Sequence, residues 1–118
     1  MKVDVCLIGD GFNVSNFKNY SDKVFKFKYK LELIQEFGEP SKRGPNKGKP
    51  SKYGFCWING ITLKQLSRID PHCFKAYNVD KISINIKEKD IKSQTCLYVD
   101  KELISIAYKI DANIEIVD

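Results

Sequence analysis

Features that define several large functional classes are missing from this 118-residue sequence. No apolar run is longer than Val5–Ile8, far short of the roughly 20 apolar residues of a membrane-spanning helix. The acid at Asp4 stands where a secretory signal peptide would carry its apolar segment. We therefore expect a cytoplasmic protein that makes no membrane contact.

Closely spaced cysteines and histidines are also missing. No two of the four cysteines lie within four residues of each other, and His72 is the single histidine, so the spacing of a zinc site is absent. Free cysteines in apolar segments behave as small buried hydrophobic residues. We expect reduced, structural thiols and neither metal nor cofactor; the cysteines are Cys6, Cys56, Cys73 and Cys96.

No group of residues has the arrangement that catalysis requires. His72 and Cys73 are adjacent, and adjacent side chains do not face each other in a helix or strand. Residues 9–11, Gly-Asp-Gly, lack the third glycine of a dinucleotide site and the Lys-Ser/Thr of a P-loop, so they predict a tight turn. The carboxylates Glu88, Asp90, Asp100 and Glu102 alternate with lysines, as on a solvated surface. We expect no enzymatic activity.

Alternating apolar and polar residues predict most of the β-strands. Val3, Val5 and Leu7 indicate the first strand. The longest alternation, residues 25–33, places aromatic residues and leucines on one face and lysines on the other. The remaining predicted strands are 55–58 (closed by Asn59-Gly60), 82–86, 95–99 and 114–117.

Capping signals predict the helices. Thr62 begins one, because Gln65 completes a capping box and Ile61 and Leu66 are spaced for a hydrophobic staple. Pro71 breaks or restarts this helix. Residues 14–23 are ambiguous, with Ser15 as the cap of a short helix. The last helix has Asp100 as its N-cap and a buried face of Leu103, Ala107 and Ile110.

The element order predicts one α+β domain over residues 1–118. Its sheet is a single, mostly antiparallel layer of about five or six strands, with two or three helices packed on one face. The short strand 55–58 carries the only tryptophan, and we expect Trp57 to pack in the core beside the second helix, the one that begins at Thr62.

Positive charge is concentrated in one part of the chain. No acid occurs between Glu39 and Asp70, so residues 40–69 carry a charge of +7 and the rest carries −2. Residues 38–54 contain four glycines, three prolines and no aliphatic residue, which predicts a long exposed loop. The candidate partner-binding residues are Lys42, Arg43, Lys47, Lys49, Lys52 and Tyr53.

This basic loop admits two functional interpretations besides that of a solvated linker. It can contact an acidic protein surface, or it can contact nucleic-acid phosphates while Tyr53 and Phe55 stack on bases. Both give the chain a binding role.

Three segments resemble a known family. Residues 7–10 (Leu-Ile-Gly-Asp), the Gly/Lys-rich stretch from Lys47 to Trp57, and Leu103–Ile116 follow one another as in the mainly bacterial domain-of-unknown-function family 4279. The lysine-rich residues 18–37 depart from the leucine-rich helix of that family. The chain is also similar in kind to immunity proteins of contact-dependent growth inhibition systems, which act by binding a toxin.

We therefore expect a non-enzymatic protein-binding module, most specifically a bacterial immunity protein that blocks the active site of a toxin. The alternative is an RNA- or DNA-binding domain that uses residues 42–52. Inhibitors of basic nucleases are generally acidic, whereas this chain has a net charge of +5. The toxin would then meet either the lysine loop or the acids Asp90, Asp100, Glu102, Asp111 and Glu115.

Overall fold

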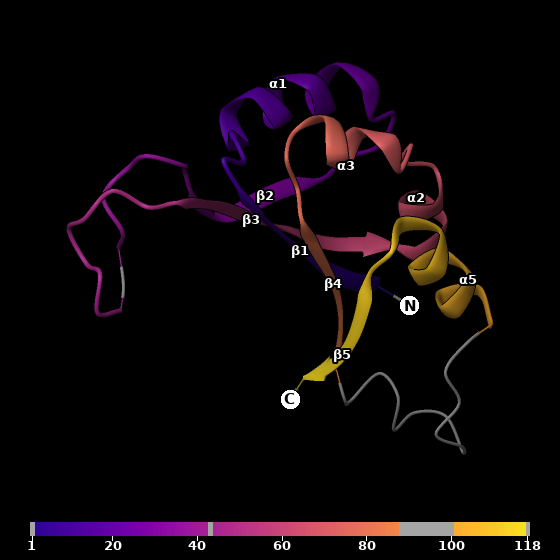
Figure 1. Cartoon of the computed structure of the whole chain (residues 1–118). Coiled ribbons are helices and arrows are strands. Elements are labelled where there is room, and N and C mark those ends of the chain that lie inside the picture. Colours follow the sequence, from indigo (N-terminus) through magenta and orange to yellow (C-terminus); the bar gives the residue numbers. More distant parts are fainter. Residues whose placement is uncertain (1, 43, 88–100, 118) are drawn as a thin grey trace.

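The computed structural model describes residues 2–42, 44–87 and 101–117, and they form an α+β fold (Figure 1). The strands are β1 (Lys2–Asp10), β2 (Lys30–Gln35), β3 (Tyr53–Thr62), β4 (Lys81–Lys87) and β5 (Asn113–Val117). The described helices are α1 (Val14–Val24), α2 (Leu63–Ser67), α3 (His72–Ala76) and α5 (Lys101–Ile110).

The strands form one sheet in the order β2-β3-β1-β4-β5. Neighbouring strands are antiparallel except β4 and β5, which are parallel and joined through α5. The predicted α+β class with a mostly antiparallel sheet is confirmed. The predicted strand 95–99 and the predicted cap Asp100 lie outside the described residues.

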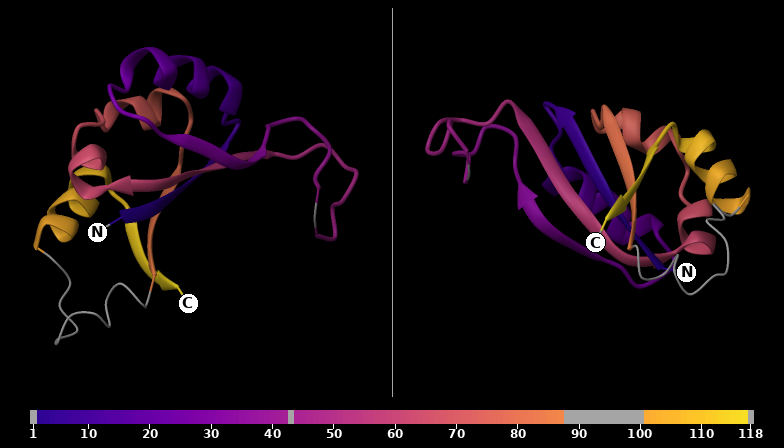
Figure 2. Two further views of the ribbon diagram at one scale, coloured as in Figure 1. Left: turned by 180° about the vertical axis from the view of Figure 1, so that it is seen from behind. Right: turned by 90° about the horizontal axis from the view of Figure 1, so that it is seen from below.

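The hydrophobic core lies between the described helices and one face of the sheet. Val5 and Leu7 of β1, Ile58 of β3 and Ile84 of β4 are completely buried. The buried residues of all four described helices belong to the same cluster. Seen from below, the strands lie in front of α1 (Figure 2, right). The other described helices pack into the same core cluster, so the described helices lie on one face of the sheet.

Two facing glycines let loops cross closely over the sheet. Gly9 pairs with Gly54 across β1 and β3. A Cβ on Gly9 would lie 1.8 Å from the carbonyl oxygen of Asn78, and one on Gly54 would lie 2.0 Å from that of Phe12. Only Gly11, with φ 70°, has the turn conformation predicted for residues 9–11, since Gly9 is still inside β1.

Strand β3 is longer than the sequence predicts. Asn59 and Gly60 do not close it, because the strand continues to Thr62 through an irregularity in its pairing with β1. Gly60 has φ 65°, and its N–H donates to Oδ1 of Asp4 over 2.8 Å. A glycine inside a strand is typical of such a bulge.

Helix α1 settles the ambiguity of residues 14–23, but its cap is not Ser15. Asn13 is the N-cap, and its side chain accepts a hydrogen bond from the N–H of Asn16. The carboxylate of Glu36, at the end of β2, accepts from the N–H groups of Val14 and Ser15 and from the Ser15 hydroxyl. Glu36 thus satisfies free donors at the positive end of the helix dipole.

The predicted strand 25–33 is wrong in its first half. Strand β2 begins only at Lys30, although Phe25, Phe27 and Tyr29 still pack against the core while the lysines between them are exposed. The alternation of residues 25–29 therefore reflects the burial of one side of this segment. It does not reflect strand pairing, because no described strand hydrogen-bonds to these residues.

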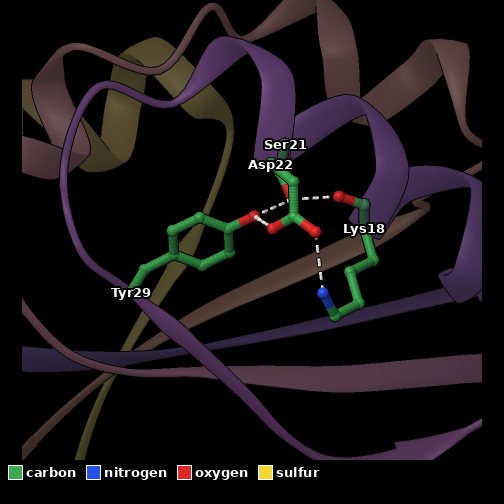
Figure 3. A network of polar contacts seen from close by, with 4 residues as sticks. All are labelled: Lys18, Ser21, Asp22 and Tyr29. Atoms are coloured by element: carbon green, nitrogen blue, oxygen red, sulfur yellow. Dashed lines mark hydrogen bonds and ion pairs between the residues drawn. The ribbon is translucent and has the colours of Figure 1, made fainter.

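A polar network attaches this segment to α1 (Figure 3). The Tyr29 hydroxyl donates to Oδ1 of Asp22 over 2.5 Å and lies 2.5 Å from Oγ of the fully buried Ser21. Nζ of Lys18 forms an ion pair with Oδ2 of Asp22 over 2.7 Å. Burial, then the hydrogen bond to Asp22, raises the pKa of Tyr29 to about 12, and the hydrogen bonds from Lys18 and Tyr29 lower the pKa of Asp22.

Local signals predicted the second half of the chain well. The capping box of Thr62 and Gln65 is present in full, and Ile61 and Leu66 are both completely buried. Pro71 separates the two short helices α2 and α3. The predicted apolar face of α5 is buried, with Ile106 in addition to Leu103, Ala107 and Ile110.

No helix in the described part of the chain is long and apolar enough to cross a membrane.

Candidate functional site

The described residues of the loop between β2 and β3 form a hydrogen-bonded ribbon, and we call residues 38–52 the basic arm. Backbone hydrogen bonds of 2.8 Å join the N–H of Gly38 to the carbonyl of Ser51, and the N–H of Ser41 to that of Lys49. Gly44 and Gly48 turn the ribbon with φ angles of 82° and 86°. Figure 1 shows the arm extending away from the body of the protein. The prediction of an exposed loop over residues 38–54 is correct only as far as Lys52, because Tyr53 and Gly54 belong to β3, and the backbone of the loop is hydrogen-bonded.

Of the predicted basic site residues that the structure describes, one lysine is held by a hydrogen bond to the backbone and three form no ion pair with a described carboxylate. Lys42 donates a hydrogen bond of 3.0 Å to the carbonyl oxygen of Ile34. Arg43 lies outside the described residues. Lys47, Lys49 and Lys52 are exposed, and no carboxylate of residues 2–42, 44–87 or 101–117 forms an ion pair with them. Their charges are available to a partner.

Tyr53, the last predicted site residue, stands where the arm joins the sheet. It begins β3 opposite Asp10, and its side chain is 55% exposed. Gly11 N–H donates to the carbonyl of Lys52, which fixes the base of the arm against the end of β1. Phe37, at the other base of the arm, is 50% exposed. The free lysines therefore lie on the projecting arm, and Tyr53 lies on the sheet at its base.

The helix-free face of the sheet, which we call the open face, continues from Tyr53. Side chains of a strand alternate between faces, so Tyr53, Phe55 and Trp57 share one face while Cys56 and Ile58 point into the core. Phe55 and Trp57 are partly buried but do not belong to the hydrophobic core. The prediction that Trp57 packs in the core beside the second helix is wrong, because the strand periodicity turns it outward.

Strand register places small and polar residues beside Trp57. A row crosses the sheet from Glu32 through Trp57, Cys6 and Ser83 to Asn113. Cys6 and Ser83 are only 7% and 9% exposed, although none of the described helices packs on this face. Ile8 lies beside Phe55 in the neighbouring row. The open face therefore carries an apolar strip on β3 and β1, next to the polar Ser83 of β4.

Charged groups surround this strip on the side away from the arm. Lys30 and Glu32 form an ion pair of 2.8 Å, and Asn59 donates to the carboxylate of Glu32. Asp4 pairs with Asn85, which pairs with Glu115. Lys2 shares the face of Asp4 on β1, and Lys87 shares the face of Asn85 on β4, so this part of the open face carries charges of both signs.

The described cysteine thiols lack the lowered pKa of a nucleophilic cysteine. Burial raises the pKa of Cys6 to about 11, with a further increase from Glu115 and an opposing effect of Lys81. Burial likewise raises the pKa of Cys56 to about 12 and that of Cys73 to about 11. Because the thiolate is the reactive form, these cysteines are unreactive at neutral pH.

His72 and Cys73 point in different directions. Cys73 is buried, whereas His72 is exposed at the rim of a depression of about 200 Å³ that Asp80 and Lys109 also line. Among the described residues, no group of three or more His, Cys, Asp or Glu side chains could hold a metal ion. Of the acids considered from the sequence, Glu102 is exposed on α5, and Glu88, Asp90 and Asp100 lie outside the described residues.

Comparison with known proteins gives no relative. No family model, no curated protein and no solved structure matches this chain. The resemblance to family 4279 stays a prediction. The basic arm and the open face are therefore the features from which a function can be inferred.

The sequence pointed to the arm but missed the open face. Phe55–Ile58 is apolar at every position, so nothing in it tells which residues face inward. The sequence did contain one signal, the glycine at position 54. The backbone of Phe12 lies against this glycine, so position 54 and the residues two and four positions further on face the core.

Proposed function

We propose that this chain is a non-enzymatic protein-binding module, and specifically an immunity protein that neutralises a toxin by covering its active site. One observation carries the proposal: three lysines without carboxylate partners among the described residues project on an arm that leads directly into a row of aromatic side chains on the open face. An aromatic, apolar centre with a charged rim is the usual composition of a protein interface.

The decisive experiment identifies the neighbouring gene and co-expresses this chain with any toxic domain that the gene encodes. The native chain should restore growth and elute with the toxin in size-exclusion chromatography. Absence of both rescue and complex would refute the proposal.

Matched triple variants test the role of the arm in that complex. Lys47→Gln, Lys49→Gln and Lys52→Gln together remove three exposed charges without touching the core. We expect them to weaken the toxin complex by at least about tenfold at low salt, because rim charges accelerate association. Lys23→Gln, Lys26→Gln and Lys28→Gln change the net charge equally at exposed positions away from the arm, and should leave affinity unchanged.

Nucleic-acid binding is the second candidate, and the continuity of Tyr53, Phe55 and Trp57 with the arm favours it. Aromatic side chains on a sheet beside a cationic groove are how many single-strand binders hold bases. It predicts an affinity for single-stranded oligonucleotides that falls steeply with salt and is lost in the arm variant. Absence of binding at low salt would eliminate this candidate.

A further inference from the structure

The aromatic row on β3 forms a set of anchors. Tyr53, Phe55 and Trp57 occupy alternate positions, so they lie roughly 6–7 Å apart along one face. Ile8 and Cys6 of β1 pair with Phe55 and Trp57 and widen the apolar strip to two strands. The three aromatic side chains keep part of their surface exposed, which leaves the outer part of the strip available to a partner.

The two ends of this strip differ in charge. At the Tyr53 end the basic arm presents Lys47, Lys49 and Lys52. At the other end the acids Asp4 and Glu115 share the open face with Lys2 and Lys87, and Lys30 forms an ion pair with Glu32, so both signs of charge are mixed there. On the sheet itself acids and lysines are mixed, with Asp10 opposite Tyr53, so the excess of positive charge is confined to the arm. Such a surface favours a partner whose acidic groups are concentrated where it meets the arm.

We propose that the open face is the docking surface for a protein whose acidic segment lies over the basic arm and whose apolar side chains cover Phe55 and Trp57. This inference rests on the proposed protein-binding function and names its surface and the chemistry of its partner. A nucleic acid is negative along its whole length, so its phosphates would meet Asp4 and Glu115. A second copy of the chain is repelled at long range by the net charge of +5.

The test uses peptide display, because this method works when the partner is unidentified. Short random peptides are selected on the immobilised full-length chain, and the enriched sequences are synthesised with a fluorescent label. Binding is measured by anisotropy, and the emission of Trp57, the only tryptophan, reports whether the peptide covers the open face.

We expect the enriched peptides to combine a cluster of Asp and Glu with apolar residues and to shift Trp57 emission to shorter wavelength. Phe55→Ala and Trp57→Ala should each weaken binding at least about tenfold, as hot-spot residues do. Tyr53→Ala, at a residue that is 55% exposed, supplies a change that does not endanger folding. Tyr108→Ala is the matched control, because Tyr108 is 89% exposed on α5 and lies off the open face. Circular dichroism of each variant verifies the fold.

Four results would overturn the proposal. In the first, the selection enriches no sequence. In the second, the peptides bind Phe55→Ala and Tyr53→Ala as tightly as they bind the native chain. In the third, an oligothymidylate probe shifts Trp57 emission at physiological salt. The fourth is self-association, measured by sedimentation, that Trp57→Ala abolishes. If the peptide experiment fails but the chain still rescues growth from the toxin, the docking surface is wrong and the proposed function stands. If the peptide experiment succeeds but the chain does not rescue growth, the immunity role is wrong.

Discussion

Replacement of Gly9 by alanine tests whether the loop containing Asn78 truly lies on the sheet at this point. The new Cβ would stand 1.8 Å from the backbone oxygen of Asn78 and 3.0 Å from Cα of Val79, where ordinary contacts begin at 3.4 Å. Backbone atoms cannot rotate away as a side chain can. The loop must therefore move by more than an ångström.

That movement disturbs the hydrogen bonds that hold the loop to β1. The N–H of Asp80 donates to the carbonyl of Ile8 over 2.8 Å, and the Asp80 carboxylate accepts from the N–H of Asp10 over 2.7 Å. Overpacking costs about 1–3 kcal/mol, and each weakened hydrogen bond adds about 1 kcal/mol. We expect Gly9→Ala to lower the free energy of unfolding by about 3–5 kcal/mol, a large part of the roughly 5–15 kcal/mol typical of a domain.

Urea denaturation followed by circular dichroism measures this loss. With a typical slope of about 1–3 kcal/mol per molar urea, the midpoint should fall by roughly 2 M. Gly48→Ala is the comparison, because a Cβ there meets no atom within 4 Å and only its φ of 86° is unfavourable. Its cost should be about 1–2 kcal/mol. If Gly9→Ala destabilises the protein no more than Gly48→Ala, the close approach of the loop to the sheet is refuted.

Three further predictions concern the capping of α1, the tyrosine network and the thiols. Glu36→Gln should lower the free energy of unfolding by about 1 kcal/mol and speed hydrogen exchange at Val14 and Ser15, while Glu39→Gln should not; equal exchange rates in both variants would contradict the cap. Tyr29 binds its proton more tightly in the folded state (pKa about 12) than an ordinary tyrosine with a pKa of 10.0, so its contribution to stability is complete below pH 10 and is lost between about pH 10 and pH 12. Tyr29→Phe should remove this part of the alkaline destabilisation in urea titrations, and an unchanged pH profile would count against the network. A thiol reagent followed by peptide mapping should leave Cys6, Cys56 and Cys73 unlabelled in the native protein at neutral pH and label them after unfolding. Rapid labelling of Cys6 in the native protein would contradict the burial of its thiol on the open face.

Local chemistry was predictable where the interaction partners are near in sequence. Thr62 and Gln65 are three residues apart, and both the capping box and the helix they begin are present. The alternation of Val3, Val5 and Leu7 likewise indicated the central strand, because one face of it is completely packed.

Long-range partners were the limit of the sequence interpretation. Glu36 caps α1 from 21 to 22 residues away, so the sequence favoured the nearer Ser15. Residues 25–29 alternate like a strand because their aromatic side chains pack inward beside α1, yet no described strand pairs with them.

The candidate site was predicted in part for the same reason. The absence of acids between Glu39 and Asp70 marked the basic arm directly. The outward direction of Trp57 depends on its register with Cys6 across the sheet, which the uniformly apolar residues 55–58 do not encode. Composition located the charge, and strand pairing located the aromatic surface next to it.

Together, the two proposals state that the toxin partner covers the open face. The emission of Trp57 tests this directly, measured in a complex with a toxic domain whose own tryptophans are replaced by phenylalanine. We expect a complex in which Trp57 emission moves to shorter wavelength and acrylamide quenching falls, because the partner excludes water from the open face. A stable complex in which Trp57 emission and quenching equal those of the free chain would show that the toxin binds elsewhere and that the open face is not the docking surface.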